Sequence, residues 1–114
     1  MELKKIYKRP YKENITKRVE MYCKQHKLIY TDLQVFNGYV TFVGYCKLPY
    51  NTIVNKLIAE RYTIQDELAI QRKHQKGVNE VEFNEYDMFV EECKAQAKAF
   101  VEERNETLGV VSNE

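Results

Sequence analysis

Five residues of this chain have side chains suited to metal binding or nucleophilic attack: three cysteines and two histidines. Cys23 and His26 are three positions apart in a segment with helical spacing, so both would lie on one side of a helix. Zn²⁺ accepts thiolate and imidazole, but structural zinc sites usually combine two closely spaced pairs, and no second pair is present. We therefore expect no metal and no cofactor. The other residues of the set are Cys46, His74 and Cys93.

A catalytic cysteine needs a base and an orienting group close to it in space. Cys93 and His74 are the combination to consider, but no sequence pattern brings them together, and His74 lies among basic residues typical of a helix end. All three cysteines fall on expected apolar faces, where a free thiol behaves as a small hydrophobic group. We expect buried, reduced thiols without a catalytic role.

Two pairs of adjacent acidic residues, Asp66-Glu67 and Glu91-Glu92, are candidates for acid–base chemistry. Adjacent side chains on a helix point about 100° apart, so neither pair forms a paired-carboxylate site. The four glycines do not cluster into a phosphate-binding loop. We expect that this protein is not an enzyme.

The first twelve residues combine basic and aromatic side chains. Lysine neutralises phosphates and tyrosine stacks on unpaired bases, so this composition suits nucleic acid. Pro10 disfavours helix at Arg9, which predicts an extended arm over 1–12, with a short edge strand over 3–7 as the alternative. The candidate nucleic-acid residues are Lys4, Lys5, Tyr7, Lys8, Arg9 and Tyr11 of the arm, which extends to Lys12, joined by Lys17, Arg18 and Lys24.

The net charge of +1 hides an asymmetry along the chain. Residues 1–30 carry nine basic groups against three acidic ones, residues 31–77 carry six against four, and residues 78–114 carry three against ten. Ends of opposite sign can attract each other within one molecule, or can stack copies head to tail. The basic end can also meet nucleic acid.

A β-hairpin is predicted around Asn37-Gly38, which lies between two β-rich runs over 28–36 and 39–47. Asn-Gly tolerates the positive φ that both central residues of a type I′ turn require. A two-residue turn at this position opposes residues whose numbers sum to 75, and opposed residues share a face of the hairpin.

That register divides the hairpin into two faces. One is mostly apolar, and we expect it to face the core; it holds Ile29, Thr31, Leu33, Val35, Val40, Phe42, Gly44 and Cys46. The other face carries four aromatic residues and a valine, which is unusual for a solvated surface, so we expect the chain or a partner to cover it. The candidate partner-binding residues are Tyr30, Phe36, Tyr39, Val43 and Tyr45.

Apolar residues at three- and four-residue spacing predict helices over 14–27, 52–62, 64–75 and 80–104. Asn14 and Asn51 are the expected N-caps of the first two, and Thr63-x-x-Asp66 predicts a capping box for the third. In the third helix we expect Ile64, Leu68 and Ile70 to point inward. The last helix would be a rod of roughly 37 Å, longer than so small a core needs.

The predicted fold class is α+β: an N-terminal helix, an antiparallel β-hairpin, then three helices ending in one long amphipathic helix. With 114 residues, 44% hydrophobic and 31% charged, the chain suits one globular domain. We predict a basic arm over 1–12, a single α+β domain over 13–105 and a frayed tail over 106–114.

No membrane or secretion signal is recognised. No apolar run approaches the ~18 residues of a membrane span, and the charged residues after Met1 are unlike a signal peptide. An odd number of cysteines without Cys-x-x-Cys favours reduced thiols inside a cell.

Two segments of the second half, Tyr62–Arg72 and Glu82–Lys98, resemble small uncharacterised proteins encoded by bacteriophages, especially phages of gut bacteria, often near virion structural genes. The resemblance covers about 40 residues and excludes the hairpin. It implies a viral structural or accessory protein, present in the host cytoplasm during synthesis and in the virion. No functional residues are carried over from it.

Two functional hypotheses follow. In the first, the chain is a small non-enzymatic structural or interaction protein, a phage virion component that docks on a larger assembly or self-associates through the second hairpin face. In the second, it is a nucleic-acid-binding accessory protein that uses the basic arm. Neither a membrane nor a small-molecule substrate is indicated.

Overall fold

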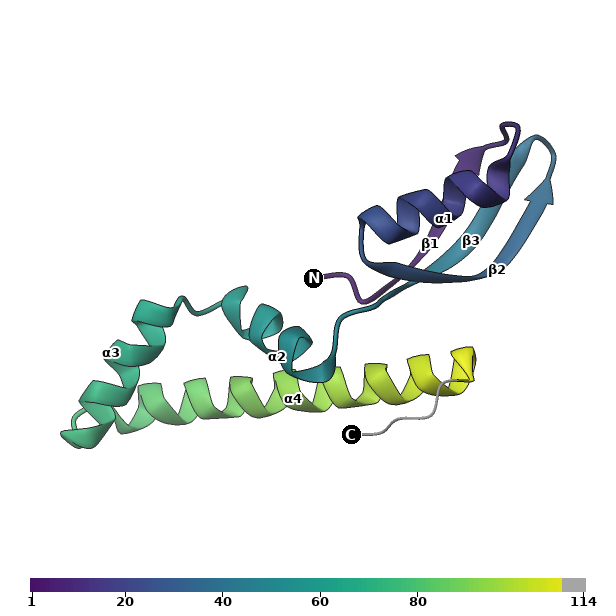
Figure 1. The fold of residues 1–114 in the computed structure, drawn as a ribbon. Helices are drawn as coiled ribbons and strands as arrows, with labels where there is room; N and C mark the ends of the chain where they lie inside the picture. The colour runs from purple at the N-terminus through teal and green to yellow at the C-terminus, as the bar shows by residue number, and fades with distance from the viewer. Residues whose placement is uncertain (110–114) are drawn as a thin grey trace. The chain divides into compact units, whose positions relative to one another are not determined.

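The computed structural model describes residues 1–109, which form two compact units (Figure 1). We call residues 2–48 the sheet unit and residues 49–106 the helical unit. Both helices and antiparallel strands are present, as the α+β prediction requires.

The sheet unit begins with a strand and not with the helix that we predicted. Its elements are β1 (Lys4–Pro10), α1 (Ile15–Gln25), β2 (Leu28–Phe36) and β3 (Tyr39–Cys46). The strand order is β1-β3-β2, and β3 is antiparallel to both neighbours, so β1 and β2 are parallel and α1 connects them. A two-stranded hairpin leaves a row of unpaired backbone groups, and β1 supplies the partner for that edge of β3.

The basic arm is therefore part of the sheet. The edge-strand alternative is correct in kind, although the strand covers Lys4–Pro10 and not 3–7. Tyr7 lies opposite Phe42 and Arg9 opposite Val40. Because side chains alternate along a strand, the basic residues of β1 are divided between the two faces of the sheet.

The predicted turn is confirmed, but the predicted register holds only near it. Asn37 and Gly38 have φ values of 50° and 78°, as a type I′ turn requires. The three pairs next to the turn follow the predicted register, and then an irregularity between Thr31 and Gln34 shifts the strand by one residue. Asp32, inside the irregularity, has φ 55°.

This β-bulge reverses the predicted faces over the first part of β2, because a shift of one residue moves every following side chain to the other face. Tyr30 lies opposite Gly44, where we had predicted Tyr45, and Ile29 lies opposite Tyr45, where we had predicted Cys46. The prediction of one uninterrupted register is wrong.

Helix α1 covers one face of the sheet (Figure 1). Val19 and Cys23 of α1 form a buried cluster with Phe42 of β3, and Tyr7 packs against this cluster. Gly44 is needed here, since a Cβ at this position would stand 2.8 Å from the ring of Tyr7. Of the residues whose spacing predicted this helix, Val19 and Cys23 are buried, Ile15 and Tyr22 are half-buried, and His26 is exposed.

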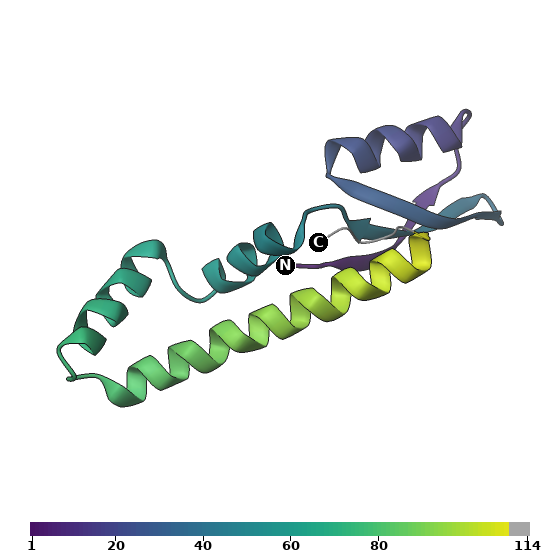
Figure 2. The ribbon, with the colours of Figure 1, turned by 60° about the horizontal axis from the view of Figure 1, so that its bottom comes forward.

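The helical unit consists of α2 (Tyr50–Ala59), α3 (Ile64–Gln75) and α4 (Glu80–Leu108), and two views show α2 and α3 along the same side of α4 (Figures 1 and 2). With 29 residues, α4 is about 43 Å long. It runs past the predicted end at 104 into the predicted tail, of which residues 110–114 lie outside the described part of the chain. Of the apolar residues whose spacing predicted α2, Ile53, Val54, Leu57 and Ile58 are buried, and Tyr62 is half-buried beyond the end of the helix.

Two of the three predicted N-cap positions are confirmed, Asn14 and Thr63, and the hydrogen bonds of Thr63 form the predicted capping box. The Thr63 hydroxyl accepts from the Asp66 N–H at 3.0 Å, and the Asp66 carboxylate accepts from the Thr63 N–H at 2.9 Å. The hydrogen bond from the Thr63 N–H to the Asp66 carboxylate lowers the pKa of this carboxyl below its usual value. Asn14 holds the N-cap position of α1 with φ 57° and without a side-chain cap bond, and Pro49, not Asn51, precedes α2.

The inward face of α3 differs from the prediction. Ile70 is buried, but Ile64 and Leu68 are exposed. At the contact with α4, the imidazole of His74 stacks on Phe83 at 3.6 Å between ring centroids. Ile70 and His74 lie four residues apart and share the side of α3 that meets α4, whereas Ile64 and Leu68 lie on another side.

Candidate nucleic-acid interface

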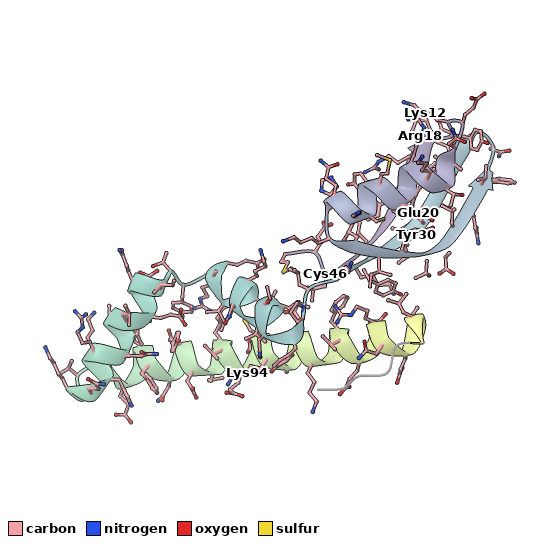
Figure 3. All side chains as sticks on the ribbon, in the orientation of Figure 1. Lys12, Arg18, Glu20, Tyr30, Cys46 and Lys94 are labelled. Carbon is pink, nitrogen blue, oxygen red and sulfur yellow. The ribbon has the colours of Figure 1, made fainter. Side chains whose placement is uncertain are left out.

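The five residues predicted to bind a partner do not share one face. Phe36, Tyr39, Val43 and Tyr45 lie on the sheet face opposite to α1, but the bulge places Tyr30 on the α1 side. There the Tyr30 hydroxyl donates to Glu20 Oε1 at 3.2 Å, and Figure 3 labels both residues.

The face opposite to α1 is unevenly exposed. Phe36 is 75% exposed, whereas Tyr45 is only 3% exposed. Ile6 of β1 lies opposite Val43 on this face and is 72% exposed. Sequence reasoning missed Ile6, because nothing in the sequence pairs the arm with β3.

The arm residues predicted to bind nucleic acid are divided by the strand. Lys5, Tyr7 and Arg9 point to the α1 side, and Lys4 and Lys8 to the other side. The ring of Tyr7 stacks on Phe42 with centroids 5.0 Å apart, and burial raises the pKa of the Tyr7 phenol. Tyr7 thus serves the core of the sheet unit, and its stacked face does not meet a base.

The structure instead gathers three cations at one end of α1. Arg9, Lys12 and Arg18 line a hollow of about 210 Å³ between β1, β3 and α1. Figure 3 shows Lys12 and Arg18 at the same end of the helix. The other residues that line the hollow are Pro10, Ile15, Val19, Tyr22, Val40 and Phe42.

Two of these cations are held by contacts within the sheet unit. The Arg9 guanidinium stands 5.3 Å from the centroid of the Tyr7 ring and 5.8 Å from that of Tyr22. The Arg18 Nε donates to the Glu13 carbonyl oxygen at 2.9 Å. These contacts already restrict both side chains, so less conformational entropy is lost when an anion binds.

Charge is distributed unequally between the two units. Residues 2–48 contain ten basic and four acidic residues, and residues 49–106 contain eight basic and twelve acidic ones. The asymmetry along the sequence is therefore also an asymmetry between folded units. A basic patch on one unit is the electrostatic feature expected of a surface that binds nucleic acid.

The sequence indicated only part of this site. Arg9, Lys12 and Arg18 all belong to the basic set predicted from the sequence, but nothing in that set singled out these three. The hollow depends on how the end of β1 meets the first two turns of α1, a contact between segments that no local pattern encodes. The run of cations and tyrosines was the available signal.

The thiols are placed as their apolar surroundings predicted. Cys23, Cys46 and Cys93 are all buried. Burial raises the pKa of the Cys23 and Cys93 thiols, which favours the unreactive protonated form. Within residues 1–109, no group of three or more His, Cys, Asp or Glu residues is arranged to hold a metal ion.

A hollow of the helical unit has a different character. It measures about 530 Å³ and lies between α2 and α3. Lys56 is the cation among its described lining residues, and Glu67 offsets that charge. We prefer the smaller hollow of the sheet unit as the candidate site, because cations converge there.

Comparisons with protein-family models, with curated proteins and with solved structures gave no match. The resemblance to phage proteins therefore remains a prediction. Of the helices in the described part of the chain, none combines the length and the apolar character that crossing a membrane requires.

Proposed function

We propose that this chain is a non-enzymatic nucleic-acid-binding protein whose sheet unit holds the phosphate backbone. The observation that carries the proposal is the convergence of Arg9, Lys12 and Arg18 on one hollow. Of the two hypotheses from the sequence, this was the alternative. We now place it first because the bulge removes Tyr30 from the expected docking face, and because Tyr45 is buried.

The physical basis is the release of counterions. Each cation that neutralises a phosphate frees condensed salt ions, so the logarithm of the binding constant falls linearly with the logarithm of salt concentration. For three contacts to a single strand, the expected slope is about −2. Guanidinium groups suit phosphate further, because two of their N–H groups can donate to one phosphate.

The test is fluorescence anisotropy of a labelled oligonucleotide, titrated with the full chain at several salt concentrations. Each of the variants Arg9→Gln, Lys12→Gln and Arg18→Gln should weaken binding and make the slope shallower by roughly 0.7. Lys94→Gln is the matched control, since it removes one positive charge from the helical unit, where Figure 3 labels the residue. A slope near zero for the unmodified chain, or equal effects of all four variants, contradicts the proposal.

A second candidate function is docking on a larger assembly, such as the virion that the resemblance implies. Its support is the exposure of Ile6 and Phe36 on the sheet face opposite to α1, since exposed apolar side chains that share one face mark interaction sites. Light scattering on the chain and on the double variant Ile6→Thr, Phe36→Ser tests self-association. If the chain is monomeric at all concentrations and the variant binds the same partners, this candidate is wrong.

A further inference from the structure

We infer that the hollow between β1, β3 and α1 takes one unpaired base of a single-stranded nucleic acid, while Arg9, Lys12 and Arg18 hold the adjacent phosphates. This inference rests on the proposed function and adds to it a substrate class. The protein would prefer single strands over duplexes.

The hollow has the size and lining for one base. Its volume of about 210 Å³ is below the range of ~300–1,000 Å³ typical of drug-sized ligands, and suits one flat ring system. Among the residues that the structure describes, those lining it include three cations and no carboxylate. The apolar part of the lining consists of Pro10, Ile15, Val19, Tyr22, Val40 and Phe42.

Tyr22 is the aromatic wall most suited to contact a base. Its ring is half-buried, and it is held edge-on by Tyr7 at 5.7 Å and tilted against His26 at 4.3 Å between ring centroids. A ring fixed in this way loses little freedom when a base stacks on it, and base–aromatic stacking tolerates any sequence because every base has a π-face.

A second hollow adjoins the first and gives the strand a path. It is lined by Arg18, Met21, Tyr22, Lys24 and Gln25 on α1. Arg18 and Tyr22 therefore belong to both hollows. A strand that leaves the first hollow would pass Arg18 and then Lys24. These two cations would contact its phosphates beyond the position of the stacked base.

Preference for a single strand follows from where bases lie in a duplex. Paired bases are stacked on their neighbours, and only their edges face the grooves. Arg9, Lys12 and Arg18 can contact the phosphates of either form, but a base enters the hollow only when it is outside the stack. Duplex binding should thus keep its phosphate contacts without the apolar ones.

The first test fills the hollow without changing charge. Ile15→Trp puts a large side chain into the lining, and Met88→Trp adds the same side chain at an exposed position of α4 that lines neither hollow. In anisotropy titrations, Ile15→Trp should lower affinity for a single strand roughly tenfold, as expected for loss of one stacked base, and leave duplex affinity unchanged. Met88→Trp should retain the single-strand preference.

A second measurement uses the unmodified chain, in case Ile15→Trp does not fold. Amide ¹H–¹⁵N shifts are followed while an unlabelled single strand is added. The amides of Ile15, Val19 and Val40 should move with the strand and not with a matched duplex. Shifts confined to other residues overturn the inference.

The possible results distinguish failure of the base pocket from failure of the proposed function. Equal affinity for single strand and duplex, with a normal salt slope and no effect of Ile15→Trp, overturns the base pocket and leaves the proposed function standing. Absence of salt-dependent binding to either form overturns both. Adenosine monophosphate is titrated separately: if it competes as well as the strand, the site is one for free nucleotides and the inference is wrong.

Discussion

Gly44 shows how a single residue shapes the packing under α1. It lies on β3 opposite Tyr30, and the ring of Tyr7 packs over it. The Tyr7 ring cannot easily move away, because it stacks on Phe42 and meets Tyr22 edge-on. The same rings hold Arg9 at the candidate site, so the packing at Gly44 and the position of a binding residue are linked.

We predict that Gly44→Ala destabilises the sheet unit by about 1–3 kcal/mol, the usual cost of overpacking a well-filled core. The added methyl carbon would stand 2.8 Å from the Tyr7 ring, closer than carbon atoms approach. Urea denaturation followed by circular dichroism measures the change.

A double-mutant cycle with Tyr7→Leu provides the control. Leucine lacks the ring atoms that the new methyl group meets, so Gly44→Ala should cost less in the Tyr7→Leu background than alone. Equal costs in both backgrounds would show that Tyr7 is not the neighbour that requires glycine.

At the scale of elements, the β-bulge in β2 decides which face each residue of the strand occupies. It separates Tyr30 from the outer aromatic residues and brings it to α1. Asp32 has φ 55° inside the bulge, a left-handed conformation that glycine adopts freely, that aspartate tolerates and that β-branched residues avoid.

This geometry predicts opposite effects for two substitutions at Asp32. Asp32→Gly should leave stability unchanged or raise it, and Asp32→Val should lower it by about 1–2 kcal/mol. A regular strand predicts the reverse order, since valine favours strands and glycine weakens them. Thermal unfolding of both variants distinguishes the two registers: a more stable Asp32→Val would show that the bulge is absent.

Elements with a local cause were predictable from the sequence. The Asn37-Gly38 turn, the Thr63 capping box and the buried stripe of α2 each depend on a few neighbouring residues. The pairing of β1 with β3, the bulge at Asp32 and the exposure of Ile64 depend on contacts between distant segments, which spacing alone does not encode. For the same reason the candidate cations were partly recognised, but the hollow between them was not.

At the scale of the whole molecule, the two structural units also differ in the sign of their charge. The sheet unit carries an excess of cations and the helical unit an excess of carboxylates. Deleting residues 1–12 would be the obvious way to test binding by a flexible arm. Here the deletion removes β1, an integral strand of the sheet, together with Arg9 and Lys12 of the candidate site.

We therefore predict that deletion of residues 1–12 unfolds the sheet unit and promotes aggregation. The loss of β1 exposes the backbone edge of β3 and the cluster around Phe42, and leaves a two-stranded hairpin, which is marginal in water. Far-ultraviolet circular dichroism should retain the signal of α2, α3 and α4, since β1 is no part of the helical unit.

The triple variant Lys4→Gln, Lys5→Gln, Lys8→Gln is the control, because it removes charge from the same segment and keeps the strand. If the shortened chain unfolds as cooperatively as the full one, β1 contributes nothing to the sheet. Residues 1–12, with Arg9, would then form a flexible arm that becomes ordered only when the ligand binds.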